Sequence, residues 1–312
     1  MTIRKLCIIS IALMLALTAA AFTPSISPWI LVPVALIGIV FLPGCLLMVN
    51  LKIAPPNRLE YLLYSFGLGL GLLLLGGLVI NWVLPYAGVL HPLAALPLVA
   101  FFDIVVALLS WNACRADGGS SAVMHWKPAN AASWFFGLFP LVFLVLSVLG
   151  SQVLNDSGTG VLTLFMLFGV AAYVIALTLC RRSVQGWVYA SALYLIGLSL
   201  LLMYSLRSAH ILGWDINLEY QMFQMTLQNL MWKMSYYPSL DYNACVSITI
   251  LPTIFAKLTN ISPEYVFKLV FQVLFAAVPV AVFAFARRYL KEGIDFLAAF
   301  LFLSQTWFFE QM

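Results

Sequence analysis

The sequence predicts an all-α, polytopic helical membrane protein with about nine transmembrane helices and an amphipathic outer loop. The first observation is composition: 64% of the residues are hydrophobic, 8% are charged, and the mean hydropathy is +1.04. A soluble domain is about half apolar and about a quarter charged, so this class is excluded. The second observation is that the apolar residues gather into segments of about 20 residues, the length that crosses a bilayer as a helix.

Nine apolar segments fit transmembrane helices. They cover residues 6–22, 29–50, 60–84, 92–112, 134–153, 160–180, 187–206, 264–286 and 294–309. The first has an alternative reading as a secretory signal, because Arg4 and Lys5 precede an apolar run that ends in the small residues 18–21.

The basic residues predict a multi-pass protein of the cell membrane with a cytoplasmic N-terminus. Positively charged residues concentrate in cytoplasmic loops. This orientation places 11 of the 15 Lys and Arg inside: Arg4, Lys5, Lys52, Arg58, Arg115, Lys127, Arg181, Arg182, Arg287, Arg288 and Lys291. The loop 207–263 is then extracytoplasmic.

Two unequal regions follow from the spacing of the spans. Residues 1–182 form an N-terminal region of six spans, and residues 183–312 hold one span, the long loop 207–263 and two further spans. Loops of this length are usually functional or disordered, and the many apolar and aromatic residues here argue against disorder. Within the loop, the apolar segment 246–259 is too short to span and is predicted to be re-entrant or interfacial.

The loop carries two acids with helical spacing. Asp215 and Glu219 are four residues apart and share one helix face, to which Thr226 returns. Two carboxylates facing a cavity can serve as a general base with its supporting partner, or as ligands for a divalent cation. The alternative is that both acids only stabilise the positive end of the helix dipole.

Further along the loop, a group of aromatic and polar side chains suits a sugar or another polar ligand. It comprises Tyr236, Tyr237, Asp241, Tyr242 and Asn243. The alternative is that the aromatic residues only anchor the chain at the membrane interface. No motif identifies a cofactor or a metal site, the five cysteines are scattered, and no basic face indicates nucleic-acid binding.

Within the spans, Asp103 stands out because a carboxylate in the middle of a membrane helix is costly and often functional. Its alternatives are a structural hydrogen bond to a neighbouring helix or a neutral, protonated acid. Gly67, Gly69, Gly71 and the pair Gly76–Gly77 predict close helix packing in the third span.

Residues 200–312 resemble a known group of membrane proteins. The shared elements are the outer-loop start Gly213-Trp214-Asp215 with Glu219-Tyr220, the short apolar segment 247–252, the span beginning at 265–268 and the end 308–312. The arrangement resembles an uncharacterised prokaryotic multi-spanning family grouped with the GT-C superfamily of membrane glycosyltransferases. That superfamily includes protein O-mannosyltransferases and aminoarabinose transferases.

The resemblance implies transfer of a sugar from a polyprenyl-phosphate donor to an acceptor on the outer face. It implies that Asp215 is the base, that Glu219 is a supporting or second acid, and that Glu310 matches a further acidic position. It also implies that the chain stops before the remaining spans of the core. We therefore expect an N-terminal piece of a longer protein, and whether it is active alone stays open.

Two other functions remain open from the sequence. The first is a transporter or lipid-binding membrane protein that uses Asp103 as its buried charge and the outer loop as a lid. The second is an accessory subunit whose core is completed by a second chain.

Overall fold

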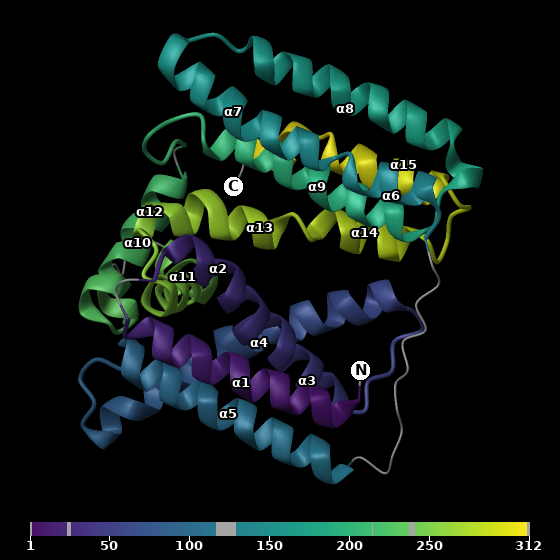
Figure 1. Ribbon diagram of the computed structural model, residues 1–312. Helices are drawn as coiled ribbons and strands as arrows, with labels where there is room; N and C mark the ends of the chain where they lie inside the picture. Colours follow the sequence, from purple (N-terminus) through teal and green to yellow (C-terminus); the bar gives the residue numbers. More distant parts are fainter. Residues whose placement is uncertain (1, 24–25, 117–128, 214, 237–240, 311–312) are drawn as a thin grey trace. The chain divides into compact units, whose positions relative to one another are not determined.

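The computed structural model describes residues 2–23, 26–116, 129–213, 215–236 and 241–310. The described part is helical, which confirms the all-α prediction (Figure 1). It divides into two compact units: unit 1 comprises 1–125 with 213–266, and unit 2 comprises 126–212 with 267–312. The predicted regions 1–182 and 183–312 follow the spacing of the spans, whereas these units follow contacts, so the two divisions describe different properties of the chain.

Unit 1 is built from two groups of helices. The first group contains α1 (Ile3–Ala21), α2 (Pro28–Ala35), the π-helical turn η1 (Leu36–Phe41), α3 (Leu42–Asn50), α4 (Arg58–Val83), the 3₁₀ turn η2 (Leu84–Ala87) and α5 (Ala95–Ala116). The second group comes from the long loop: α10 (Asp215–Asn229), the 3₁₀ turns η4 (Met234–Tyr236) and η5 (Asp241–Ala244), α11 (Val246–Thr259) and α12 (Pro263–Tyr265).

Unit 2 contains the remaining helices. They are α6 (Ala131–Leu138), α7 (Leu141–Ser157), α8 (Val161–Leu179), η3 (Arg181–Ser183), α9 (Trp187–Ser205), the π-helical turn η6 (Val266–Val270), α13 (Phe271–Phe275), α14 (Val278–Ala286), α15 (Ile294–Leu303) and α16 (Thr306–Glu310). Helix α9 is the centre of this unit, since α6, α7, α13, α14, α15 and α16 all pack on it.

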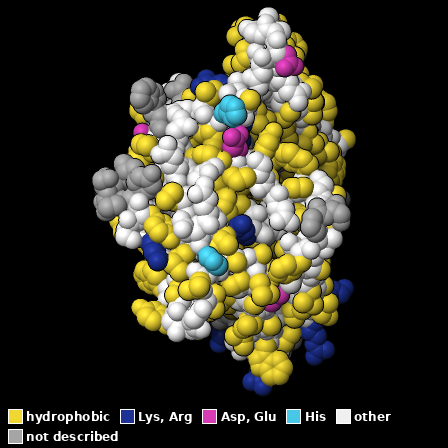
Figure 2. Space-filling view, turned by 90° about the vertical axis from the view of Figure 1, so that its left-hand side faces the viewer, with side chains coloured by type: hydrophobic (Ala, Val, Ile, Leu, Met, Phe, Trp, Pro, Cys, Tyr) yellow, Lys and Arg dark blue, Asp and Glu magenta, His cyan; other side chains and the backbone are white. Residues whose placement is uncertain are grey.

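Eight of the described helical segments are long and apolar enough to cross a membrane. They match the first eight predicted spans to within a few residues. The ninth, predicted over 294–309, is divided by a turn at Ser304–Gln305 into α15 and α16, and α15 alone has 10 residues. Large apolar side chains are exposed along the spanning helices, and the face in Figure 2 is largely hydrophobic with few charges. Such a surface is stable in lipid, so the chain is membrane-embedded.

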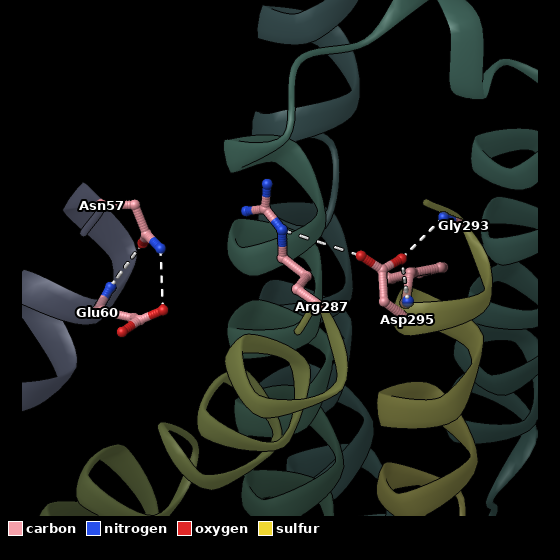
Figure 3. Close-up of polar contacts among 6 residues, drawn as sticks. Asn57, Glu60, Arg287, Gly293 and Asp295 are labelled. Atoms are coloured by element: carbon pink, nitrogen blue, oxygen red, sulfur yellow. Dashed lines mark hydrogen bonds and ion pairs between the residues drawn. The ribbon is translucent and has the colours of Figure 1, made fainter. Parts of the chain in front are cut away.

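Short polar residues set the helix starts. Asn57 caps α4: its Oδ1 accepts from the Glu60 amide at 3.0 Å, and its Nδ2 donates to Glu60 Oε1 at 3.0 Å (Figure 3). Asn130 caps α6 by accepting from the Ser133 amide at 2.8 Å. These contacts satisfy amide groups that a helix start leaves unpaired.

Glycine permits two close backbone contacts in unit 1. A Cβ on Gly69 of α4 would lie 1.8 Å from the Val40 carbonyl oxygen, and one on Gly44 of α3 would lie 1.7 Å from the Ser65 carbonyl oxygen. The second span and α4 therefore touch backbone to backbone at Gly69, as predicted. The predicted close packing at Gly67 and Gly71 was wrong, because a Cβ at either position would meet nothing within 4 Å.

Candidate functional site

Residues 215–236 and 241–263 of the long loop belong to unit 1 and fold onto one end of its other helices. The Leu93 amide donates to the Leu230 carbonyl at 2.9 Å, and His91 Nδ1 lies 3.1 Å from the Asn229 carbonyl. Asn81, near the end of α4, pairs with Trp232 in both directions: its Nδ2 donates to the Trp232 carbonyl at 2.9 Å and its Oδ1 accepts from the Trp232 amide at 2.7 Å. Hydrogen bonds thus hold this part of the loop to the end of α4 and to the connection between α4 and α5.

Helix α11 is the base on which α10 rests. It is 14 residues long, about 21 Å at 1.5 Å per residue, which is short of a hydrocarbon core of about 30 Å. Ten of its residues are buried, and it packs on α1, α2, α4, α5 and α10. A Cβ on Gly77 of α4 would lie 2.5 Å from Ile250 Cγ2, so the contact with α4 is tight. Figure 1 shows α11 end-on while α1 and α5 run across the view, so α11 crosses these helices.

The two acids lie on α10, as predicted, but in different environments. Met222, Phe223 and Thr226 form the buried face of α10 against α11. Glu219, one turn before Phe223, lies at the edge of this face and is half-buried, whereas Asp215 is exposed at the start of the helix. The pair therefore consists of a solvent-accessible carboxylate, Asp215, and a partly buried one, Glu219.

Burial raises the pKa of the Glu219 carboxyl above its usual 4.5, and the negative charge of Asp215 raises it further. Both effects disfavour the ionised form of Glu219. The Tyr242 phenol lies beside Asp215; its pKa is raised by desolvation and then by the Asp215 charge. Asp215, Glu219 and Tyr242 are hereafter called the acid cluster. It offers an exposed proton acceptor, a carboxyl group that holds its proton more firmly, and a phenol hydroxyl.

The other predicted site residues are placed as follows. Tyr236 is half-buried at the end of η4, and Asp241 is exposed at the start of η5. Tyr237 lies outside the described residues. Glu310 ends α16 in unit 2, and its side chain is outside the described part.

Asn243 does not present its amide to a ligand. It is buried, and its Nδ2 donates to the carbonyls of Lys233 and Met234 at 3.0 Å each, while the Asn243 carbonyl accepts from Trp232 Nε1 at 2.8 Å. The expected ligand-lining role of Asn243 is therefore replaced by a structural one, because its polar groups hold the turn after α10.

Within the described ranges, no group of three or more His, Cys, Asp or Glu side chains could hold a metal ion. A divalent cation at Asp215 and Glu219 would thus need ligands from elsewhere, and the question of a cofactor stays open.

Asp103 is tied to the neighbouring helix. The Thr18 hydroxyl of α1 donates to Asp103 Oδ2 of α5 at 2.9 Å, which is the structural alternative weighed from the sequence. Asp103 Oδ1 is buried and has no hydrogen-bond partner among the residues that the structure describes.

Two structural residues were not singled out by sequence reasoning. Asn81 looks like an isolated polar residue in a membrane helix, yet it anchors Trp232. Lys268 is only 6% exposed, and its Nζ donates to the carbonyls of Ser208 and Ala209, the latter at 3.1 Å. Asn81 could have been identified from its position near the end of a span, because buried amides in membrane helices need hydrogen-bond partners.

Searches against models of protein families, curated proteins and solved structures find no match.

Proposed function

We propose that this membrane protein is a GT-C-like glycosyltransferase, or a part of one, that transfers a sugar from a polyprenyl-phosphate donor to an acceptor on the extracytoplasmic face of the cell membrane. Asp215 is the base that accepts the proton of the acceptor hydroxyl, and Glu219 is the supporting acid. The proposal takes its chemistry from the sequence resemblance. The observation that carries it is the acid cluster, in which an exposed carboxylate lies beside a half-buried one.

The geometry supports distinct roles for the two acids. Asp215 is exposed, so a polar acceptor can reach it from the aqueous phase. Glu219 is desolvated and lies within the electrostatic reach of Asp215. Two carboxyl groups in different environments can hold and release a proton separately, as acid–base chemistry requires. The cluster lies at an end of the spanning helices, where a lipid-linked donor would present its headgroup.

The test measures sugar transfer by the full chain in lipid vesicles. The probes are polyprenyl-phosphate mannose and polyprenyl-phosphate glucose labelled in the sugar, with release or transfer of the label as the readout. Loss of a general base costs about 10²- to 10⁴-fold in rate, which is the effect expected for Asp215→Asn. The matched control is Asp156→Asn, which removes an exposed acid from the end of α7 in unit 2 and should leave the rate unchanged. Equal, measurable rates for wild type and Asp215→Asn would reject the role of Asp215.

A transporter is the second candidate, and the unpaired Asp103 Oδ1 is the observation that favours it. Asp103→Asn keeps a group that can accept from Thr18 while removing the acid. If the protein is a transporter, this variant loses solute flux in vesicles and Asp215→Asn does not. If it is a glycosyltransferase, Asp215→Asn loses sugar transfer and Asp103→Asn does not. An accessory subunit would show neither activity until its partner chain is supplied.

A further inference from the structure

One end of unit 2 concentrates positive charge. The connection between α8 and α9 carries Arg181 and Arg182, and the connection between α14 and α15 carries Arg287, Arg288 and Lys291. All five side chains are exposed. Figure 1 shows both connections at the same end of unit 2, the end that the sequence predicts to be cytoplasmic. We name these five residues the basic cluster.

The two connections interleave their arginines. The Arg181 side chain lies beside Gly293, with Nη1 3.7 Å from the position of a Cβ there. The Arg287 guanidinium lies beside Gly186, with Nη2 3.7 Å from the corresponding position. Each connection thus places a guanidinium against a glycine of the other, so Arg181 and Arg287 lie where the two connections meet.

The buried acid of this region is already satisfied within the fold. Asp295 Oδ1 accepts from the amides of Gly293 and Phe296 at 2.8 Å each, and Oδ2 lies 4.0 Å from Arg287 Nε (Figure 3). Among the described residues of the two connections and the first turn of α15, Glu292 and Asp295 are the acids, so five basic residues stand beside two acidic ones. An excess of positive charge therefore remains at the surface.

A further feature indicates the chemistry of a ligand. Large apolar side chains stand exposed next to the cations; they are Leu179 (79%), Phe285 (65%), Tyr289 (72%) and Ile294 (51%).

We propose that the basic cluster binds the phosphate headgroup of an anionic membrane phospholipid, whose acyl chains lie along the exposed apolar side chains beside it. Clusters of Lys and Arg at the ends of membrane helices attract anionic lipids. A free phosphate ion would use the cations but not the apolar surface, and this surface favours the lipid. The site is separate from the acid cluster and independent of the proposed transferase activity.

The test titrates the full chain in neutral detergent with phosphatidylglycerol, phosphatidylcholine or inorganic phosphate, and counts bound lipid by native mass spectrometry. The variant Arg181→Gln/Arg182→Gln/Lys291→Gln keeps the Arg287–Asp295 pair. Its matched control, Arg4→Gln/Lys5→Gln/Lys52→Gln, removes the same charge from exposed positions of unit 1. We expect wild type to prefer phosphatidylglycerol, and we expect the first variant to lose roughly ten-fold or more in affinity. The control should stay within about two-fold of wild type, since it leaves the basic cluster intact.

Equal losses in both triple variants would overturn the proposal, because a general charge effect would then explain binding. The proposal would also be overturned if wild type bound phosphatidylcholine or inorganic phosphate as tightly as it binds phosphatidylglycerol. If the triple variant does not fold, Arg182→Gln alone replaces it, with an expected loss of roughly five-fold. Unchanged affinity in that variant would also reject the site.

Discussion

Gly69→Ala tests the backbone contact between α4 and the second span. The new Cβ would lie 1.8 Å from the Val40 carbonyl oxygen, whereas non-bonded atoms settle near about 3.5 Å. The obstacle is backbone, so no side chain can move aside, and the helices must separate by roughly 1.5 Å. Overpacking costs typically 1–3 kcal/mol, and we expect a loss of about 3 kcal/mol in the free energy of unfolding at this rigid site.

The assay is thermal unfolding of the purified chain in detergent. A loss of about 3 kcal/mol lowers the midpoint of a chain of 312 residues by about 5 °C. Gly67→Ala and Gly71→Ala are matched controls on the same helix, since a Cβ at either position meets nothing within 4 Å. Removing a flexible glycine there should be neutral or stabilising by up to about 1 kcal/mol. Equal midpoints for all three variants would refute the close contact between the two spans.

Two further predictions concern the outer loop. Asn81→Leu removes two partly buried hydrogen bonds to Trp232, worth about 1 kcal/mol each, so tryptic cleavage after the exposed Lys233 should rise by about 30-fold. The control Asn155→Leu should leave the cleavage rate unchanged, and an unaltered rate in Asn81→Leu would contradict the anchoring role. Glu219 has a raised pKa in the folded state, so its contribution to stability is fully present below about pH 4.5 and is lost as the pH rises through the higher folded pKa. Melting temperatures of wild type and Glu219→Gln between pH 4 and 8 should therefore diverge, with wild type becoming relatively less stable as pH rises; parallel curves would show that Glu219 is not desolvated.

Sequence reasoning located the spans because apolar length is a local property. It also placed Asp215, Glu219 and Thr226 correctly on one helix, because the period of a helix follows from spacing. The break of the last predicted span at Ser304 was missed, since two polar residues in an apolar run do not reveal where a helix ends.

Long-range partners were beyond the sequence. The exposed apolar stripe of a membrane helix does not show which neighbour it contacts, so the pairing of Asn81 with Trp232 and the burial of Lys268 depend on the fold. Asn243 was expected to line a ligand site because its type suits sugars. Its position after a turn instead commits its amide to the backbone of Lys233 and Met234.

The most direct measurement of the central claim is chemical rescue of Asp215→Ala in the vesicle transfer assay. If Asp215 is the base, the variant transfers little labelled sugar, and added formate, a small carboxylate that can occupy the vacated position, restores part of the rate. Formate should give no such gain to wild type or to Asp156→Ala. Full activity of Asp215→Ala without formate would contradict the account, as would loss of activity that formate does not repair in a variant that melts like wild type.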